Sequence, residues 1–164
     1  NPLSTLNRFP SANQSFVTNL RSDFAALQAT KRTPRSISKI RRRDERLEEL
    51  GPLEIEIMST EAEAVAESLH HKSLQLAEMG VHSFTEQDLS KFFALLMGKA
   101  NGKPSSLHLF RLLQSGKPIS SLIGASYGKT FWLMILSISP DAQRQLPHGD
   151  YIFRNSFDWA CANN

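Results

Sequence analysis

The stretch 131–162 constrains this chain more than any other part of its sequence. An apolar run that predicts a strand leads through a short polar stretch, containing Pro147 and Gly149, into an amphipathic pattern that predicts a helix. The first N–H groups of a helix have no intrahelical acceptor and lie at the positive end of the helix dipole. A strand, a tight loop and a helix start in this order therefore predict a site for a pyrophosphate, as in an acyl-CoA or a nucleotide.

Length and composition predict one globular domain. Of the 164 residues, 40% are hydrophobic and ten are Phe, which is enough to fill a core. The one cysteine, Cys161, excludes an internal disulfide, and its apolar helical surroundings indicate a buried thiol rather than a nucleophile. No apolar run approaches the roughly 20 residues that span a bilayer, and no secretion signal is visible, so we expect a cytoplasmic protein. Because the first residue is not Met and the last predicted helix should lead into more sheet, we also expect a fragment, truncated at its C-terminal end.

Apolar periodicity and the positions of Pro and Gly predict a lead-in with a helix at 1–34 and a domain at 35–164. The stretch 53–58 alternates apolar and acidic residues, which predicts a strand with one buried face. The expected elements of the domain are a basic helix at 35–50, a strand at 53–58, helices at 61–79 and 86–98, strands at 107–113, 118–127 and 130–138, and a helix at 147–162.

The net charge of +3 conceals a polarised distribution of charges, with a basic run before an acidic one. The basic run contains Lys31, Arg32, Arg35, Lys39, Arg41, Arg42, Arg43 and Arg46. Asp44 and Glu45 lie among these cations and permit pairs three and four residues apart, as on a solvated helix face. Two other interpretations stay open, in which the cations bind phosphates of a cofactor or substrate, or bind nucleic acid. No aromatic residue interrupts the run, which disfavours nucleic acid because stacking platforms are missing.

The sequence offers little sign of a metal site or of a functional histidine. The sequence has no zinc-ligand spacing, Walker loop or paired-carboxylate motif, so we expect no metal site. His70 and His71 point about 100° apart on a predicted helix, and we expect them at the surface. His108 alternates with apolar neighbours, which predicts exposure on the outer face of the sheet. His148 is the best candidate, since a protonated imidazole in the polar loop could contact pyrophosphate.

Four segments, in a fixed order, resemble the CelD/BcsL-like acetyltransferases, a family of the GNAT superfamily that is named for an association with bacterial cellulose biosynthesis. The segments are residues 41–54, 109–112, 116–128 and 147–150. Each motif alone is degenerate, and the specificity of the resemblance comes from their order. Together with the first residues of the chain, the resemblance covers nearly the whole sequence.

The resemblance implies a GNAT acyl-CoA N-acyltransferase fold of the α/β (α+β) class, with a mixed, mostly antiparallel sheet flanked by helices and incomplete at its C-terminal end. It also implies acetyl-CoA as cosubstrate and an amine acceptor that attacks directly, without a covalent enzyme intermediate. The acceptor would belong to polysaccharide or cell-envelope metabolism. Two alternatives remain: a tRNA-dependent aminoacyltransferase of the peptidoglycan-bridge type, and a non-catalytic scaffold with the GNAT fold.

The same resemblance implies where the cosubstrate binds. The pantetheine arm would pair with the backbone of Leu136, Ser137 and Ile138. The pyrophosphate would lie on the loop and helix start formed by Arg144, Gln145, Leu146, Pro147, His148, Gly149 and Asp150. The loop departs from the superfamily pattern, because Pro147 replaces its first glycine and removes one N–H donor. Whether Pro147 weakens CoA binding stays open, as does an ordinary helix start that binds no ligand. The catalytic acid or base has no matching position in this chain, and the acceptor and the oligomeric state stay open.

Overall fold

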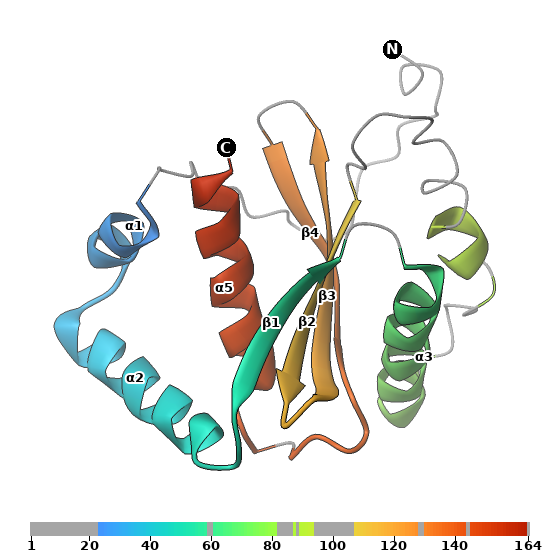
Figure 1. Cartoon of the computed structure of the whole chain (residues 1–164), viewed down its shortest axis with the longest axis horizontal. Coiled ribbons are helices and arrows are strands. Elements are labelled where there is room, and N and C mark those ends of the chain that lie inside the picture. The colour runs from blue at the N-terminus through green and yellow to red at the C-terminus, as the bar shows by residue number, and fades with distance from the viewer. Residues whose placement is uncertain are drawn as a thin grey trace.

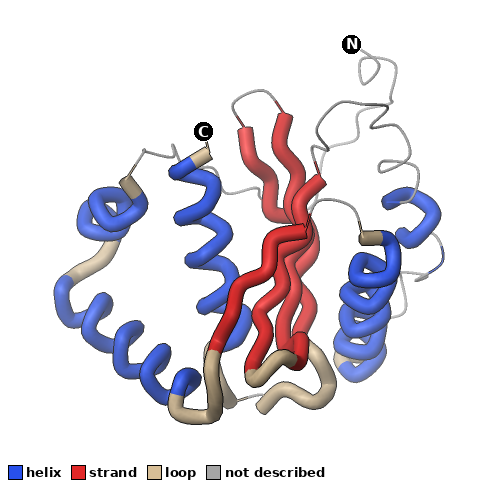
Figure 2. Tube along the Cα trace, viewed as in Figure 1, coloured by secondary structure: helices blue, strands red, loops and turns tan. Residues whose placement is uncertain are grey.

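A computed structural model describes residues 23–58, 61–81, 87, 89–93, 107–127, 130–143 and 145–163. Its labelled elements are α1 (Phe24–Lys31), α2 (Pro34–Glu48), β1 (Leu53–Met58), α3 (Ala62–Glu78), β2 (Leu107–Gln114), β3 (Lys117–Tyr127), β4 (Thr130–Ile138) and α5 (His148–Ala162). Residues 89–93 are also helical. The strands form a central layer, with α1, α2 and α5 on one side and α3 on the other (Figure 1). Figure 2 shows the same three layers by type of structure.

The sheet has the order β1-β2-β3-β4, and each neighbouring pair is antiparallel. The turn between β2 and β3 places Ser115 at φ 52° and Gly116 at φ 77°. Two residues with positive φ are typical of the tight turns that match the twist of an antiparallel hairpin. The expected meander of three strands at 107–138 is thus present, and a sheet that is mostly antiparallel is confirmed.

The middle of the sheet is buried on both faces, because helices cover each of them, whereas the edge strands β1 and β4 keep exposed residues such as Ile57 and Trp132. The core on the α5 side contains Leu47, Phe110, Leu112, Ile119, Leu122, Ala142 and Ile152. The core on the α3 side contains Ala64, Val65, Leu69, Phe93, Leu107, Leu109 and Ile123. Successive side chains of β2 alternate between these two cores, as strand geometry requires. A strand covered on both faces reads as a nearly continuous apolar run, which explains the composition of β2.

Most element bounds lie within two residues of the prediction. The strand at 53–58 is β1 as predicted, and its Leu53 and Ile55 pack on the α5-side core. The basic helix α2 begins at Pro34, because Thr33 Oγ1 accepts a hydrogen bond from the Ser36 N–H and proline suits the first helical position. The predicted helix at 86–98 lies only partly within the described residues, and most of the lead-in at 1–34 lies outside them.

The prediction that His108 is exposed on the outer face of the sheet is wrong. Its ring centroid lies 4.6 Å from that of Trp159 and 5.9 Å from that of Phe131, and its Nε2 lies 2.7 Å from Ser126 Oγ. Since Leu107 faces α3, the next residue of the strand faces α5. Sequence alternation placed the residue on the correct strand but could not show which face α5 covers.

Candidate functional site

β4 is the last strand in the sheet order, so one of its edges has no strand partner within the described part of the chain. A β-bulge interrupts its pairing with β3. Ile135 lies opposite Ile123 and Leu133 lies opposite Gly124, so Met134 has no partner. An extra residue of this kind bends the strand and increases its local twist. The bulge comes shortly before the residues that were predicted to contact pantetheine.

The backbone groups of Leu136 and Ile138 are directed toward the open edge of β4. The Ser139 N–H donates to the Ile119 carbonyl across the β3 pairing, at 3.0 Å. Backbone directions alternate along a strand, so Ser137 also faces β3, whereas Leu136 and Ile138 face away from it. The open edge therefore offers N–H and C=O groups at the two positions that the resemblance assigned to the pantetheine arm.

The structure does not bring Ser137 to this edge. Its side chain is fully buried, and its Oγ lies 2.9 Å from the Oγ of Ser68 on α3. Its carbonyl oxygen accepts a hydrogen bond from Ser120 Oγ at 3.1 Å. The polar groups of Ser137 are thus used inside the fold, where they link β4 to α3 and β3.

Two successive turns connect β4 to α5. The Ala142 N–H donates to the Ser139 carbonyl at 3.1 Å, and the Leu146 N–H donates to the Gln143 carbonyl at 3.0 Å. Leu146 also packs against the α5-side core, and Pro147 is buried. Hydrogen bonds and apolar contacts therefore fix the course of the loop before the helix begins.

The first N–H groups of α5 have no hydrogen-bond acceptor among the residues that the structure describes. Its N-cap is Pro147, at φ −85° and ψ 41°, and no side chain caps the helix. The Tyr151 N–H donates to the Pro147 carbonyl at 2.9 Å and is the first donor of the helix, so the N–H groups of His148, Gly149 and Asp150 have no intrahelical acceptor. Together with the helix dipole, these three donors form a site that suits an anion.

Two predicted loop residues lie just before this turn. Gln145 is exposed to solvent, so its side chain can be changed without disturbing the core. Arg144 lies outside the described residues.

Gly149 brings the start of α5 close to β4. A methyl group added at Gly149 would lie 3.0 Å from Leu136 Cδ2 and 3.8 Å from Ile138 Cδ1. The missing side chain lets the helix approach the strand, so the free N–H groups lie next to the edge residues. A bulky replacement at Gly149 would disturb this packing, and it would therefore test the fold as much as it tests anion binding.

The side chain of His148 points into the protein. It is 1% exposed, and its Nε2–H donates to the Gln143 carbonyl at 3.0 Å. Its Nδ1 is buried without a hydrogen-bond partner among the described residues. Burial lowers the pKa of His148 from 6.5, against the opposing effect of the hydrogen bond to Gln143. The neutral imidazole holds the loop against the helix start, and the expected contact of a protonated side chain with pyrophosphate has no support in this geometry.

Acidification is expected to destabilise the fold through His148. The pKa of the His148 imidazole lies below 6.5 in the folded state and near 6.5 in the unfolded state. The unfolded state then carries more protons, so the free energy of unfolding falls as the pH drops below 6.5, by at most about 1.4 kcal/mol per pH unit. Urea unfolding of the wild type and of His148→Gln, between about pH 7 and about pH 5, measures the effect. Burial also lowers the pKa of His108, but this residue is present in both proteins and contributes equally to their pH dependence. The two profiles should therefore differ by the effect of His148 alone, and parallel profiles would contradict the prediction.

Arg154 joins the first turns of α5 to α2. Its guanidinium donates to both carboxylate oxygens of Asp44, at 2.9 and 2.5 Å, and to Asp150 Oδ2 at 3.3 Å. The Arg154 and Asp44 side chains are only 12% and 18% exposed. The arginine balances the charge of Asp150, which otherwise lies beside the proposed anion site. Sequence reasoning missed this network, although the spacing of four residues between Asp150 and Arg154 was a visible signal.

The described residues show no sign of a metal site, a membrane-spanning helix or an exposed thiol. Within the described residues, no group of His, Cys, Asp and Glu side chains could hold a metal ion. None of the described helices is long and apolar enough to cross a membrane. Cys161 is buried, as its apolar surroundings predicted.

The sequence and the structure were compared with known families, curated proteins and solved structures. The family model described as "Acetyltransferase (GNAT) domain" matches residues 34–164, and no curated protein matches. The solved structures that match include the ribosomal-protein-S18-alanine N-acetyltransferase from Escherichia coli, with 22% identity, a TM-score of 0.43 and coverage of 65% of this chain and 59% of that chain. They also include the aminoglycoside acetyltransferase meta-AAC0020 from an uncultured soil metagenomic sample, in complex with sisomicin, with 16% identity, a TM-score of 0.43 and coverage of 68% and 71%. The chain thus spans less than two thirds of the length of the Escherichia coli protein.

Proposed function

We propose, from the premise that this chain belongs to the acetyltransferase (GNAT) domain family, that it moves an acetyl group from acetyl-CoA to an amine acceptor. One observation carries the proposal: the uncapped start of α5 lies against β4 at the residues whose backbone faces the open edge. Donors for a pyrophosphate and a strand edge for a chain of amide groups are thereby neighbours. Acetyl-CoA contains both of these chemical groups, with the thioester beyond the amides.

The residues present fit this cosubstrate. The N–H groups of His148, Gly149 and Asp150 would bind the pyrophosphate. The backbone of Leu136 and Ile138 would pair with the pantetheine amides, as a sheet edge pairs with an added strand. Acetyl-CoA supplies a thioester that is activated toward amines. A backbone N–H of this edge that reaches the thioester oxygen would stabilise the developing oxyanion by roughly 3 kcal/mol.

Direct attack by the acceptor amine suits the side chains of this chain. Its one cysteine, Cys161, is buried and therefore offers no accessible thiol nucleophile. In a direct transfer, a C–N bond to the acceptor forms, the C–S bond of the thioester breaks, and CoA leaves as a thiolate that takes up a proton. The amine nitrogen loses its proton to solvent or to a base. The enzyme then contributes position and oxyanion stabilisation rather than a covalent intermediate.

The acceptor that we propose is an amino sugar or another amine of the cell envelope, acetylated in the cytoplasm. This finer assignment depends on the resemblance of residues 41–54, 109–112, 116–128 and 147–150 to the CelD/BcsL-like acetyltransferases. Acetylation of glucosamine, compared with acetylation of a peptide amino terminus, tests the class of acceptor. Faster acetylation of the peptide would contradict the amino-sugar assignment.

Replacing Gln145 by glutamate is expected to weaken binding of acetyl-CoA about fivefold. The exposed side chain precedes the free N–H groups of α5 by three residues, and a carboxylate there repels a bound pyrophosphate by about 1 kcal/mol. Calorimetric titration of acetyl-CoA into the wild type and into Gln145→Glu measures the change. Titration of acetyl-pantetheine, which has no pyrophosphate, should give equal affinities for the two proteins.

Asn163→Asp is a matched control, because it adds the same charge at the opposite end of α5, about 22 Å away along the helix axis. We expect its affinity for acetyl-CoA to equal that of the wild type. Equal losses in Gln145→Glu and Asn163→Asp would overturn the placement of pyrophosphate at the helix start. Absence of any heat with a well-folded wild type would overturn the acetyl-CoA proposal itself.

The tRNA-dependent alternative has one supporting observation. Arg35, Lys39, Arg42 and Arg46 are all exposed, and their spacings of four, three and four residues place them along one side of α2. Such a stripe could follow phosphates of an RNA. Tight tRNA binding that weakens steeply with salt, in the absence of acetyl-CoA binding, would favour this alternative. A folded protein that binds neither ligand would favour the scaffold.

A further inference from the structure

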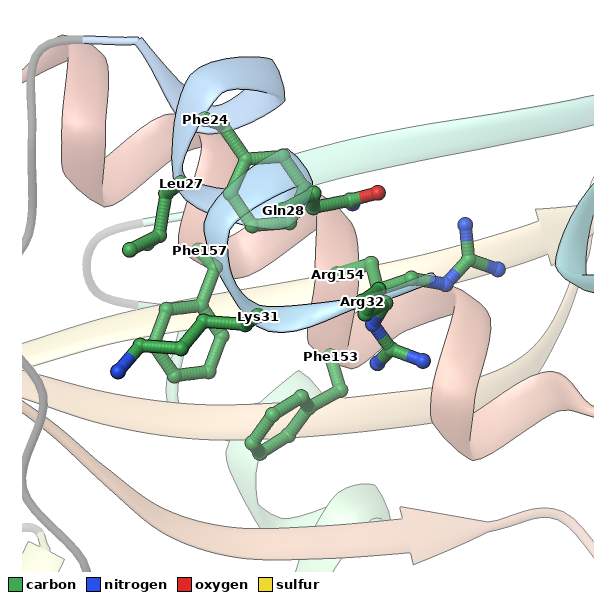
Figure 3. Close-up of a pocket in the computed structure, with 8 residues that line it drawn as sticks. All are labelled: Phe24, Leu27, Gln28, Lys31, Arg32, Phe153, Arg154 and Phe157. Carbon is green, nitrogen blue, oxygen red and sulfur yellow. The ribbon is translucent and has the colours of Figure 1, made fainter. Parts of the chain in front are cut away.

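A pocket of about 350 Å³ lies between α1 and the face of α5 that is turned away from the sheet (Figure 3). Its apolar surface comes from Phe24 and Leu27 of α1 and from Phe153 and Phe157 of α5. The rings of Phe24 and Phe157 are stacked, with centroids 6.5 Å apart and planes 12° apart, and Phe153 is 39% exposed. A pocket of this size and lining is typical of a small-molecule site, which usually occupies about 300–1,000 Å³.

The charged residues at this pocket are all cationic, and its other polar residue is the neutral Gln28. Lys31, Arg32 and Arg154 line it, and none of the described residues that line it is acidic. Figure 3 shows Arg32 and Arg154 on one side of the pocket and the amine of Lys31 on the other side, beside Phe157. Asp44 and Asp150 already balance the charge of Arg154. Lys31 and Arg32 are exposed and have no ion pair with any described residue, so the pocket has two uncompensated cations.

We propose that this pocket binds a small amphipathic carboxylate, with its apolar chain against the phenylalanine rings and its carboxylate on the guanidinium of Arg32, while Lys31 adds positive charge on the other side of the pocket. Transfer of the ligand's apolar chain from water into the pocket supplies the affinity, and the two cations favour an anion over a neutral molecule of the same shape. A guanidinium can hold a carboxylate through two parallel hydrogen bonds, which makes Arg32 the more selective of the two cations.

The pocket is separate from the proposed acetyl-CoA contacts. α1 precedes the residues that the family model matches, 34–164, so five of the eight lining residues come from a segment outside that model. On α5 it uses residues 153–157, whereas the proposed pyrophosphate donors lie at 148–150. The inference therefore does not depend on the acetyltransferase proposal.

Decanoate is the probe that tests the pocket, titrated by calorimetry into the full chain. We expect saturable binding to one site, and weaker binding of decan-1-ol, which has the same chain without the charge. The double variant Lys31→Gln/Arg32→Gln should lose about tenfold in affinity for decanoate. The matched control Lys39→Gln/Arg42→Gln removes two exposed charges from α2 and should bind decanoate as the wild type does.

Three results would overturn the proposal. The first is absence of saturable decanoate binding to a protein that melts cooperatively. The second is equal affinity for decanoate and decan-1-ol, or equal losses in the two double variants. The third is loss of acetyl-CoA affinity in Lys31→Gln/Arg32→Gln, because that result would assign the cations to the cosubstrate. Phe153→Ser, at a partly exposed position, should weaken decanoate binding while the melting temperature stays close to that of the wild type.

Discussion

Arg154→Met is expected to lower the free energy of unfolding by about 3 kcal/mol. The arginine is 12% exposed and donates three hydrogen bonds, two to Asp44 on α2 and one to Asp150 on α5. Methionine fills a similar volume but leaves the Asp44 carboxylate largely buried without its cation. The remaining cost is therefore that of an uncompensated charge rather than that of a cavity. Urea unfolding monitored by circular dichroism measures the change.

Two further variants separate this cause from a general effect of removing an arginine. Arg41→Met removes an exposed cation that lies 3.5 Å from Glu45, with side chains 77% and 57% exposed, and should change stability by no more than about 0.5 kcal/mol. Adding Asp44→Leu to Arg154→Met removes the stranded carboxylate and should recover much of the loss. If the double variant is no more stable than Arg154→Met, the buried charge is not the cause.

The fold was largely predictable from local patterns in the sequence. Alternation at 53–58 predicted β1, and the GNAT-type α/β fold that the resemblance implied is confirmed by the family match over residues 34–164. These patterns reflect hydrophobic periods of 2 and 3.6 residues, which depend on neighbours in the sequence. The bulge at Met134 was not predictable, because it is a property of the register between two strands.

The candidate site was predictable only in part. The loop and the helix start at 147–148 were visible from Pro147 and Gly149, but the direction of the His148 side chain was not. A histidine in a polar loop looks exposed in sequence, whereas here the fold buries the ring and the Gln143 carbonyl accepts a hydrogen bond from its Nε2–H. The partner of Arg154 lies 110 residues away, so no local pattern could identify Asp44.

Phe110→Ala should lower the free energy of unfolding by about 4 kcal/mol, which is a large part of the roughly 5–15 kcal/mol that stabilises a typical domain. The side chain is fully buried in the α5-side core. Its ring packs edge-on against Trp159 and Phe131, with centroids 5.4 and 6.0 Å away. Alanine removes the ring from between the sheet and α5, where the backbone cannot close the space. Chemical unfolding followed by Trp fluorescence measures the loss.

Phe110→Leu keeps most of the apolar volume and should cost less than half as much, whereas Phe92→Ala, at a residue that is 46% exposed, should cost less than about 1 kcal/mol. Similar losses for Phe110→Ala and Phe92→Ala would show that burial between sheet and helix is not what matters. The same core positions α5 along its length, from Trp159 to Ile152, and Ile152 lies one turn after the free N–H groups. We therefore expect Phe110→Leu, which stays folded, to weaken acetyl-CoA binding less than Gln145→Glu does, because packing holds the helix whereas charge acts on the ligand.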